Sequence, residues 1–241
     1  MSGIVIVGAG LGGLRAAESA RAAGYQGPIT MIGDEPHLPY TRPPLSKEAL
    51  AAGIDVAALE FRRKSSIDDV AWLLHHSVVG SDLAEHEVHL DDGRALSFEA
   101  LVVASGIRPR RLPLPGLARW GYVLRTADDA ARLRERLTPG ARVVVLGSGF
   151  IGCEVAATAR TLGCDVAVVS LDPQPMVRPL GAELGAAMQR RHESHGVMFH
   201  LGRTALALHG RDTRVTSVSL SDGTELPADV VVEAVGSVPN V

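Results

Sequence analysis

The first candidate chemistry in this sequence is the binding of phosphate groups by a glycine-rich turn. An apolar run at residues 4–7, Ile-Val-Ile-Val, leads into Gly8, Gly10 and Gly13, and helix-forming residues follow. A strand, a G-x-G-x-x-G turn and a helix, in this order, bind a pyrophosphate, because the backbone approaches it closely and the helix N-terminus offers free N–H groups. Asp34 follows the next apolar run, where an acid hydrogen-bonds a ribose. This segment therefore predicts a dinucleotide site.

The same arrangement occurs a second time. Arg142 and the apolar run 143–146 precede Gly147, Gly149 and Gly152, and residues 153–159 are again helix-forming. One G-x-G-x-x-G is weak evidence, because a glycine turn can close any strand–helix unit, but two correctly flanked copies are strong evidence. The sequence therefore predicts two nucleotide-binding folds.

The elements around these turns predict the fold class. An Asp-Asp-Gly-Arg turn indicates a small antiparallel sheet before a separate strand at 101–104, and a Ser-Asp-Gly turn at 221–223 indicates a second one. We therefore expect an α/β protein with two Rossmann-like domains, each with a small antiparallel β-meander, the second domain being inserted in the first. The expected boundaries are 1–112 for the first domain and 113–236 for the second, with 237–241 starting the return to the first.

Composition and charge exclude several classes of protein. The 241 residues are 46% hydrophobic and 21% charged, which is typical of a globular chain and not of a disordered one. A formal net charge of −3 argues against nucleic-acid binding, and no apolar run reaches the ~20 residues that span a bilayer. Cys153 and Cys164 have neither redox-pair nor metal-site spacing. We expect no metal site and a reducing, cytoplasmic setting.

The stretch 39–47, Pro-Tyr-Thr-Arg-Pro-Pro-Leu-Ser-Lys, narrows the interpretation. With the two glycine turns, the Ala104-Ser105-Gly106 segment and the Gly-x-x-Pro-Asn segment at 236–240, it resembles the NAD(P)H-dependent ferredoxin reductases of oxygenase and cytochrome P450 systems. These are the putidaredoxin reductase and biphenyl dioxygenase reductase type of the two-dinucleotide-binding flavoproteins. The resemblance implies an enzyme that passes electrons from NAD(P)H through FAD to a [2Fe-2S] ferredoxin, which serves a cytochrome P450 or a ring-hydroxylating oxygenase.

The resemblance also assigns roles to residues. It implies that Lys47 lies beside the flavin ring and pairs with Glu154. A cation there stabilises the negative charge of the reduced ring, so we predict that the charged atoms of these two residues lie within direct or water-bridged reach. The nicotinamide nucleotide would lie at Gly147, Gly149, Gly152 and Ser170. The implied FAD-binding residues are Gly8, Gly10, Gly13, Asp34, Arg42, Lys47, Val78, Ala104, Ser105, Gly106 and Arg125.

Two departures from the family pattern leave questions open. Ser170 stands where NADH-dependent members carry an acid, so the choice between NADH and NADPH is open, with Asp172 and Arg178 as nearby candidates. The Gly-Asp motif of the superfamily and its interface domain would follow Asn240. We therefore expect the N-terminal portion of a longer reductase, or a truncated homologue, that holds FAD poorly by itself.

Two further hypotheses concern the class of protein and its partner. The alternative to a reductase is a non-catalytic nucleotide-binding remnant or redox sensor of the same fold. A disulfide reductase is disfavoured, because residues 40–47 contain no cysteine. The basic runs 62–64 and 108–111 are solvated faces or, in a sharper interpretation, surfaces that steer an acidic ferredoxin.

We predict that Ser170→Glu sharpens the preference of an active form for NADH over NADPH. A carboxylate at this position would accept hydrogen bonds from the ribose hydroxyls and repel a 2′-phosphate. A charged hydrogen bond contributes ~1.5–3 kcal/mol, so the ratio of the two kcat/KM values should change about tenfold or more. An unchanged ratio would show that residue 170 does not face the ribose.

Overall fold

The computed structural model describes residues 3–240, which divide into two compact units. Unit 1 comprises residues 3–41, 55–107 and 239–240. Unit 2 comprises residues 42–54 and 108–238, so the segment 42–54 packs with residues that follow it far along the chain.

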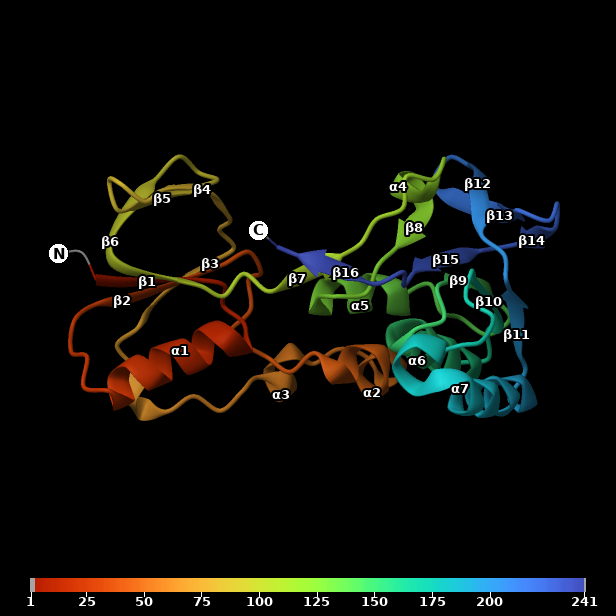
Figure 1. Ribbon diagram of the computed structural model, residues 1–241, viewed down its shortest axis with the longest axis horizontal. Coiled ribbons are helices and arrows are strands. Elements are labelled where there is room, and N and C mark those ends of the chain that lie inside the picture. Colours follow the sequence, from red (N-terminus) through yellow and green to blue (C-terminus); the bar gives the residue numbers. More distant parts are fainter. Residues whose placement is uncertain (1–2, 241) are drawn as a thin grey trace. The chain divides into compact units, whose positions relative to one another are not determined.

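Unit 1 contains a six-stranded sheet in the order β3-β2-β1-β6-β5-β4 (Figure 1). The strands from β3 to β6 run parallel, and β6, β5 and β4 pair antiparallel as a meander. Helix α1 (Leu11–Ala22) packs on one face of this sheet. The strands are β1 (Gly3–Val7), β2 (Ile29–Gly33), β3 (Ala71–Leu74), β4 (Val78–Asp82), β5 (Glu87–Leu90) and β6 (Ala95–Val103).

The expectation of a separate strand at 101–104 is wrong, because β6 is continuous from the meander into the parallel sheet. Its first half pairs with β5, and residues 98–103 pair with β1. The register shifts between Gly3 and Ile4, which lie opposite Phe98 and Ala100. This irregularity lets one strand change partners, and a bulge of this kind has no reliable signature in the sequence.

Side-chain alternation along the central strands explains the two apolar layers of unit 1. Successive residues of a strand point to opposite faces, so Ile6 and Met31 pack with Leu14 of α1, whereas Val5 and Ile32 pack on the other face. The apolar positions of the meander cover that other face, and these are Val88, Leu90 and Phe98. The short elements of unit 1 are α3 (Val56–Leu59) and the 3₁₀ helix η2 (Ser65–Ile67).

Unit 2 contains a second parallel sheet, in the order β11-β10-β9-β15-β8, and a three-stranded antiparallel sheet, β12-β13-β14. The α/β class, the two parallel sheets and the two meanders agree with the sequence-based expectation. The strands are β8 (Gly121–Tyr122), β9 (Arg142–Leu146), β10 (Asp165–Ser170), β11 (Val197–Leu201), β12 (Ala205–Arg211), β13 (Arg214–Leu220), β14 (Glu225–Pro227) and β15 (Val230–Glu233).

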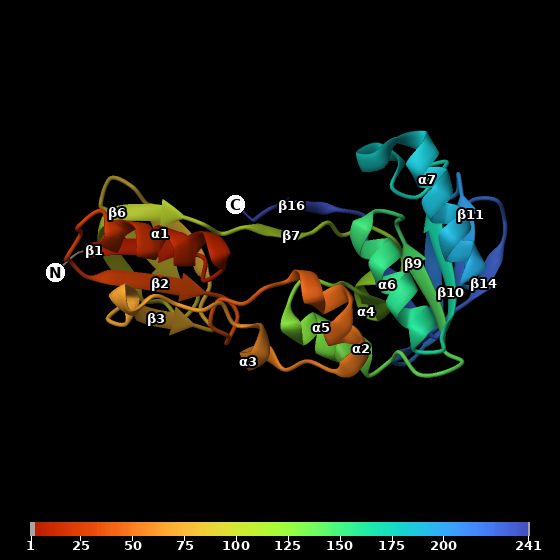
Figure 2. The same cartoon turned by 90° about the horizontal axis from the view of Figure 1, so that it is seen from below.

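The helices of unit 2 follow from local sequence signals. Thr126 and Asp129 form a reciprocal capping box that starts α5, and Gly181 has a non-helical backbone that kinks α7. Figure 2 shows α6 and α7 beside the parallel sheet. None of the helices in residues 3–240 has the length and apolar character that crossing a membrane requires. The helices are η1 (Pro43–Ser46), α2 (Glu48–Ala52), α4 (Leu117–Trp120), α5 (Ala127–Arg134), α6 (Phe150–Thr161) and α7 (Val177–Ser194).

The two faces of the parallel sheet of unit 2 are covered by different elements. Helix α6 packs on β9 and β10 through its buried residues, among them Val155 and Ala159. On the other face, Val144 and Val231 join the buried side of the meander, which includes Val218. Two short strands, β7 (Ile107–Pro109) and β16 (Ser237–Pro239), pair where the chain passes between the units.

A bidentate ion pair lies at the amino-terminal ends of β9 and β15 in this sheet. Arg142, at the start of β9, donates from Nη2 and Nε to the two carboxylate oxygens of Asp229, at 2.7 and 2.8 Å. The backbone N–H of Arg142 also donates to Asp229, at 3.0 Å. The hydrogen bonds from the Arg142 side chain lower the pKa of Asp229 to about 2. The pair therefore joins two strands whose residues are far apart in the sequence.

We predict that Asp229→Asn reduces the loss of unfolding free energy that occurs as the pH falls below about 4. The carboxylate of Asp229 has a lower pKa in the folded state than in the unfolded chain, so its contribution is complete above the unfolded value of about 4 and is lost as the pH falls towards about 2. The difference in unfolding free energy between parent and variant, measured by urea denaturation, should be constant above about pH 5 and shrink below about pH 4. A difference that persists undiminished at pH 2 would contradict this account.

Candidate functional site

The glycine turn of unit 1 connects β1 to α1, and each of its three glycines meets a different steric requirement. Gly8 has a φ of +117°, and a Cβ there would overlap the carbonyl oxygen of Ala104. A Cβ at Gly13 would overlap the carbonyl oxygen of Gly8, so the helix start packs directly on the turn. At Gly10, a Cβ would meet nothing within 4 Å. The first and third glycines are therefore needed for packing, and the middle one borders open space.

The glycine turn of unit 2, between β9 and α6, repeats this construction. Gly147 has a φ of +108° and lies against the carbonyl of Ala234, and Gly152 lies against the carbonyl of Gly147. Gly149 again borders open space, with nothing within 4 Å of an added Cβ. In both turns, therefore, packing requires the first and third glycines but not the middle one.

The helices that follow the two turns fit an anionic ligand. Gly10 and Gly149 are the N-cap residues of α1 and α6, and neither helix has a side-chain cap or an acid in its first turn. The first N–H groups of a helix have no partner within the helix, and its dipole makes this end positive. An open cradle at the middle glycine, together with these uncapped N–H groups, is what a pyrophosphate requires. Both turns therefore fit a dinucleotide.

The other unit 1 residues predicted for the first site lie around the carboxyl end of the unit 1 sheet. Asp34 follows β2 directly and is exposed, and the preceding Gly33 packs against Ala9 of the glycine turn. The backbone N–H of His76 donates to Gly33 at 2.9 Å, which holds the start of β4, and hence Val78, next to the end of β2. Ala104 donates from its backbone N–H to Val7 at 2.7 Å, so Ser105 and Gly106 follow β6 beside the turn.

The glycine turn of unit 2 opens into a pocket of about 370 Å³. Ser170, at the end of β10, lines this pocket as expected, but its hydroxyl is already engaged. Ser170 accepts a hydrogen bond from the Ser148 hydroxyl at 2.8 Å and another from the backbone N–H of Asp172 at 3.2 Å, and it is buried. Sequence reasoning missed Ser148, although its place inside the glycine motif was the available signal.

An ion pair just after the end of β10 lines the pocket, on the side where a ribose hydroxyl or a 2′-phosphate would be bound. The guanidinium of Arg178 lies 3.1 Å from the carboxylate of Asp172, and both residues line the pocket. The Arg178 side chain is 81% exposed, so it can move to another partner at little cost. Two further arginines, Arg110 and Arg203, also line the pocket, and Arg203 is paired with Asp222 at 2.5 Å.

Lys47 and Glu154 lie in unit 2 and form a direct ion pair, as predicted. The Nζ of Lys47 is 2.8 Å from Oε1 of Glu154 and also donates to the carbonyl of Pro43 at 2.9 Å. The Ser46 hydroxyl donates to Oε2 of Glu154 at 2.5 Å, and the Thr158 hydroxyl donates to the carbonyl of Ser46 at 2.7 Å. Three polar contacts therefore attach the segment 42–54 to α6, and the contact of Lys47 with Pro43 lies within the segment.

Ser46 and Thr158 were not singled out from the sequence, because they are 112 positions apart and each is an ordinary residue locally. Arg42 and Arg125 were, and the structure brings them together: Nη1 of Arg42 donates to the carbonyl of Arg125 at 2.8 Å. Both lie in unit 2 with Lys47, whereas the glycines assigned to FAD lie in unit 1.

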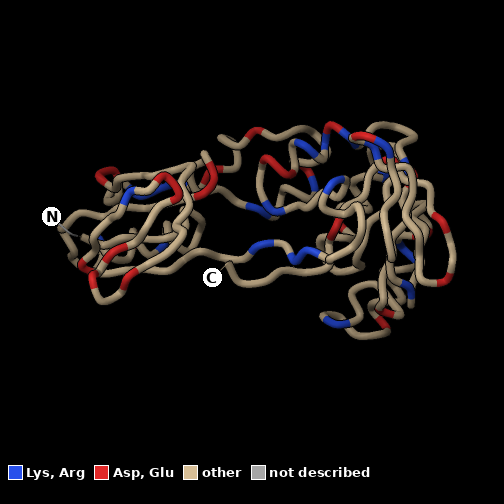
Figure 3. The backbone as a smooth tube through the Cα atoms, turned by 90° about the horizontal axis from the view of Figure 1, so that it is seen from above, with Lys and Arg blue, Asp and Glu red and all other residues tan. Residues whose placement is uncertain are grey.

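The two basic runs lie among acidic residues. Lys and Arg as well as Asp and Glu occur in both units (Figure 3). Arg63 lies 3.8 Å from Glu60, and Arg111 lies 2.9 Å from the buried carboxylate of Glu233, which also accepts a hydrogen bond from the backbone N–H of Leu112. Burial raises the pKa of Glu233. Part of each run is thus engaged in local pairing.

Neither cysteine has the properties of a reactive thiol. Cys153 and Cys164 are free and buried. Burial raises the pKa of Cys153 to about 11, and burial also raises the pKa of Cys164. A thiol with a raised pKa is protonated at neutral pH and is a poor nucleophile.

Comparison with known proteins agrees with this geometry. The model of the family described as pyridine nucleotide-disulphide oxidoreductase matches residues 2–241. The chain belongs to this family. It is 39% identical to rhodocoxin reductase of Rhodococcus erythropolis, covering 99% of this chain and 56% of the relative. It is 40% identical to the ferredoxin–NAD(+) reductase component of the p-cumate 2,3-dioxygenase system of Pseudomonas putida, covering 100% of this chain and 60% of the relative.

Solved structures give the same result. The ferredoxin reductase for the CYP199A2 system of Rhodopseudomonas palustris superposes with a TM-score of 0.91 at 41% identity, over 100% of this chain and 60% of that one. Putidaredoxin reductase, solved in a covalent complex with putidaredoxin, superposes with a TM-score of 0.92 at 35% identity, over 99% and 59%. The predicted family resemblance is therefore confirmed, and the chain spans about 60% of the length of these proteins.

We predict that alanine has little effect on stability at one glycine of the unit 2 turn and destabilises the protein at another. Gly149→Ala should change the unfolding free energy by less than about 0.5 kcal/mol, because its Cβ enters open space. Gly152→Ala should destabilise by about 1–3 kcal/mol, because its Cβ overlaps the Gly147 carbonyl. Urea denaturation of the two variants measures both effects, and equal losses would contradict the division of roles.

Proposed function

We propose that the full protein is an FAD-dependent ferredoxin–NAD(P)+ reductase, with the glycine turn of unit 1 holding FAD and that of unit 2 holding NAD(P)H. The observation that carries this proposal is the pair of glycine turns with open middle glycines and uncapped helices. The relatives named as ferredoxin reductases support it. The domain boundaries near 112 and 236, and the insertion of the second domain in the first, belong to the same proposal.

The bound flavin would supply the redox chemistry, accepting a hydride from the nicotinamide and releasing single electrons to a [2Fe-2S] ferredoxin. The part of this chain is to bind and orient. In unit 1, Gly10 would leave room for the pyrophosphate, and Asp34, which follows β2 and is exposed, would accept hydrogen bonds from a ribose. Val78, Ala104, Ser105 and Gly106 are proposed to complete that site.

Lys47 would supply positive charge at the flavin ring. Its ammonium is held by Glu154 and by the carbonyl of Pro43, and Glu154 is held in turn by Ser46. A long lysine side chain loses considerable rotamer freedom when it is fixed, and this network fixes it before any ligand arrives. Arg42 and Arg125, which are bonded to each other, are proposed to contact FAD from the same unit.

The selection between NADH and NADPH would depend on the ion pair of Asp172 and Arg178. With Ser170 engaged by Ser148, we assign the contact with a ribose or a 2′-phosphate to these two residues, because they follow the end of β10. Arg110 and Arg203 also line the pocket, and Arg203 is paired with Asp222. A carboxylate favours NADH and a guanidinium favours NADPH. Because both are present, we propose weak discrimination with a modest preference for NADH.

The proposed partner is an acidic ferredoxin, steered in part by the arginines of the segment 108–111. The cytoplasmic setting is proposed on the two cysteines, which are both free.

An anaerobic spectroscopic titration tests the proposed function. The full protein, purified with FAD, should show a protein-bound flavin spectrum that bleaches when NADH is added and recovers when an oxidised [2Fe-2S] ferredoxin follows. Flavin that binds but is not bleached would instead support the non-catalytic remnant, and an absence of flavin binding by both this chain and its full-length form would overturn the proposal.

We predict that Lys47→Met lowers the rate of flavin bleaching by NADH about tenfold or more, because the reduced ring loses a charge-assisted contact. The matched control is Lys64→Met, since Lys64 is the other lysine of the sequence and is exposed in unit 1. Stopped-flow absorbance of both variants gives the comparison. Equal rates in the two variants would remove Lys47 from the reaction.

A further inference from the structure

Unit 2 contains another pocket, of about 800 Å³. It lies at the amino-terminal ends of the parallel strands, whereas the glycine turn lies at their carboxyl ends. Gly140, Ala141 and Asp229 line it, and they precede β9 and β15. Gly147 and Gly236, which line the pocket of the glycine turn, follow the carboxyl ends of the same two strands. Because β9 and β15 are parallel, the two pockets lie at opposite ends of the strands. The larger pocket is therefore separate from the proposed nicotinamide site.

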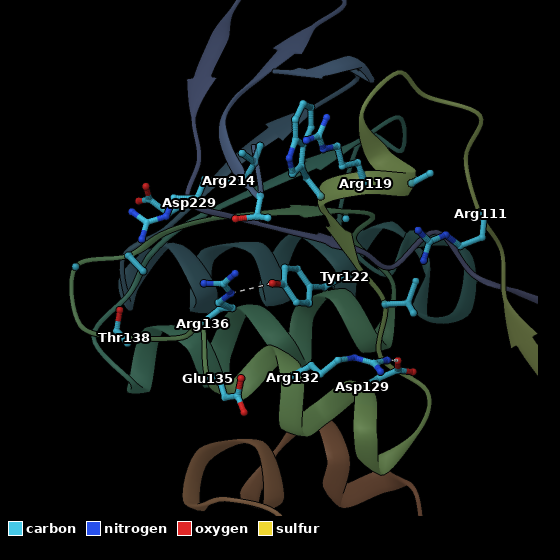
Figure 4. Close-up of a pocket in the computed structure, with 18 of the residues that line it drawn as sticks. Arg111, Arg119, Tyr122, Asp129, Arg132, Glu135, Arg136, Thr138, Arg214 and Asp229 are labelled. Atoms are coloured by element: carbon cyan, nitrogen blue, oxygen red, sulfur yellow. Dashed lines mark hydrogen bonds and ion pairs between the residues drawn. The ribbon is translucent and has the colours of Figure 1, made fainter. Parts of the chain in front are cut away.

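Charge is unevenly distributed in this pocket. Its lining has five arginines and three carboxylates (Figure 4). Two of the three carboxylates are already paired, Asp129 with Arg132 at 2.5 Å and Asp229 with Arg142 at 2.7 Å, and Arg111 is paired with Glu233. Among the described residues, three lining arginines have no carboxylate within ion-pair distance, namely Arg119, Arg136 and Arg214.

Aromatic side chains hold two of these three guanidinium groups in place. The Nε of Arg136 donates to the Tyr122 hydroxyl at 2.9 Å, which leaves its two terminal nitrogens available, and Figure 4 shows this pair in the pocket. The guanidinium of Arg119 lies over the ring of Trp120, 5.3 Å from its centroid. Cation–π contact orients an arginine without neutralising its charge. Each group thus has an aromatic neighbour that orients it and keeps its capacity to bind an anion.

The third arginine is positioned by a turn that Trp120 anchors. The indole Nε1 of Trp120 donates to the carbonyl of Asp212 at 3.1 Å. Asp212 has a φ of +49°, in the tight turn that joins β12 to β13, and Arg214 is the first residue of β13. The turn and Arg214 are therefore tied to the same helix, α4, that carries Arg119.

We propose that this pocket binds a nucleoside diphosphate or triphosphate. Three guanidinium groups without carboxylate partners match a ligand with several phosphate charges, because arginine binds phosphate oxygens in a bidentate manner. The partly buried rings of Trp120 and Tyr122 provide a surface for the base, and a volume of about 800 Å³ suits a small-molecule ligand. The inference does not depend on the proposed reductase activity, because it uses other residues.

Fluorescence of Trp120 gives a direct readout of this site. The sequence has two tryptophans, and Trp72 lies in β3 of unit 1, so the Trp72→Phe chain reports on Trp120. Titration of this chain with ADP at low salt should change the emission and saturate. Adenosine and inorganic pyrophosphate, titrated separately, should each bind about tenfold or more weaker than ADP, because each offers half of the recognised chemistry.

Three variants of the Trp72→Phe chain distinguish binding in this pocket from nonspecific attraction to surface arginines and from binding in the glycine-turn pocket. Arg136→Gln combined with Arg214→Gln should weaken the ADP-dependent change tenfold or more. Arg190→Gln should leave it unchanged, because Arg190 is exposed on α7 and lines neither pocket. Gly149→Val should also leave it unchanged, because that substitution blocks only the glycine-turn pocket.

The substituted arginines are exposed, so the variants should fold. Circular dichroism of the double variant and of the single variant Arg214→Gln checks this. The proposal is overturned if ADP binds the double variant as tightly as the parent, if Arg190→Gln weakens binding equally, or if Gly149→Val abolishes the change in Trp120 emission.

Discussion

The close approach of one backbone segment to another at the two glycine turns is the constraint on which the rest of this structure depends. At Gly8 and at Gly147, a strand turns against the carbonyl of the segment that follows a neighbouring strand, at Ala104 and at Ala234. A side chain at either position would separate the two strands and move the start of the following helix. The same geometry that packs the sheet also points the uncapped helix end at open space, so folding and the proposed phosphate binding depend on the same turns.

The segment 42–54 is the second determinant of the proposed function. It packs with unit 2 although its neighbours in the sequence belong to unit 1, and it does so through polar contacts of Ser46 and Lys47 with α6. Such contacts are directional, so they fix the position of the Lys47 ammonium more closely than apolar packing would. The position of this charge is what the proposed redox chemistry requires from the chain.

Much of the architecture follows from the sequence because its signals are local. Glycine spacing, apolar runs and Asp-Gly turns predicted both parallel sheets, both meanders and the helices after the glycine turns. The continuity of β6 could not be predicted, because a bulge between two pairing partners depends on tertiary packing. Thr158 was missed for a related reason: its partner, the Ser46 carbonyl, is distant in sequence and is revealed only by the fold. Ser148 stands inside the glycine motif, but its hydrogen bond to Ser170 is likewise revealed only by the fold.

Amide hydrogen exchange in the presence of each nucleotide tests the central claim most directly, because it reads the N–H groups of both turns in one experiment. The account predicts that FAD slows the exchange of amides 10–14 and that NADH slows the exchange of amides 149–153, each leaving the other turn unchanged. Protection of the opposite turn, or protection of neither turn by a nucleotide shown to be bound, would contradict it.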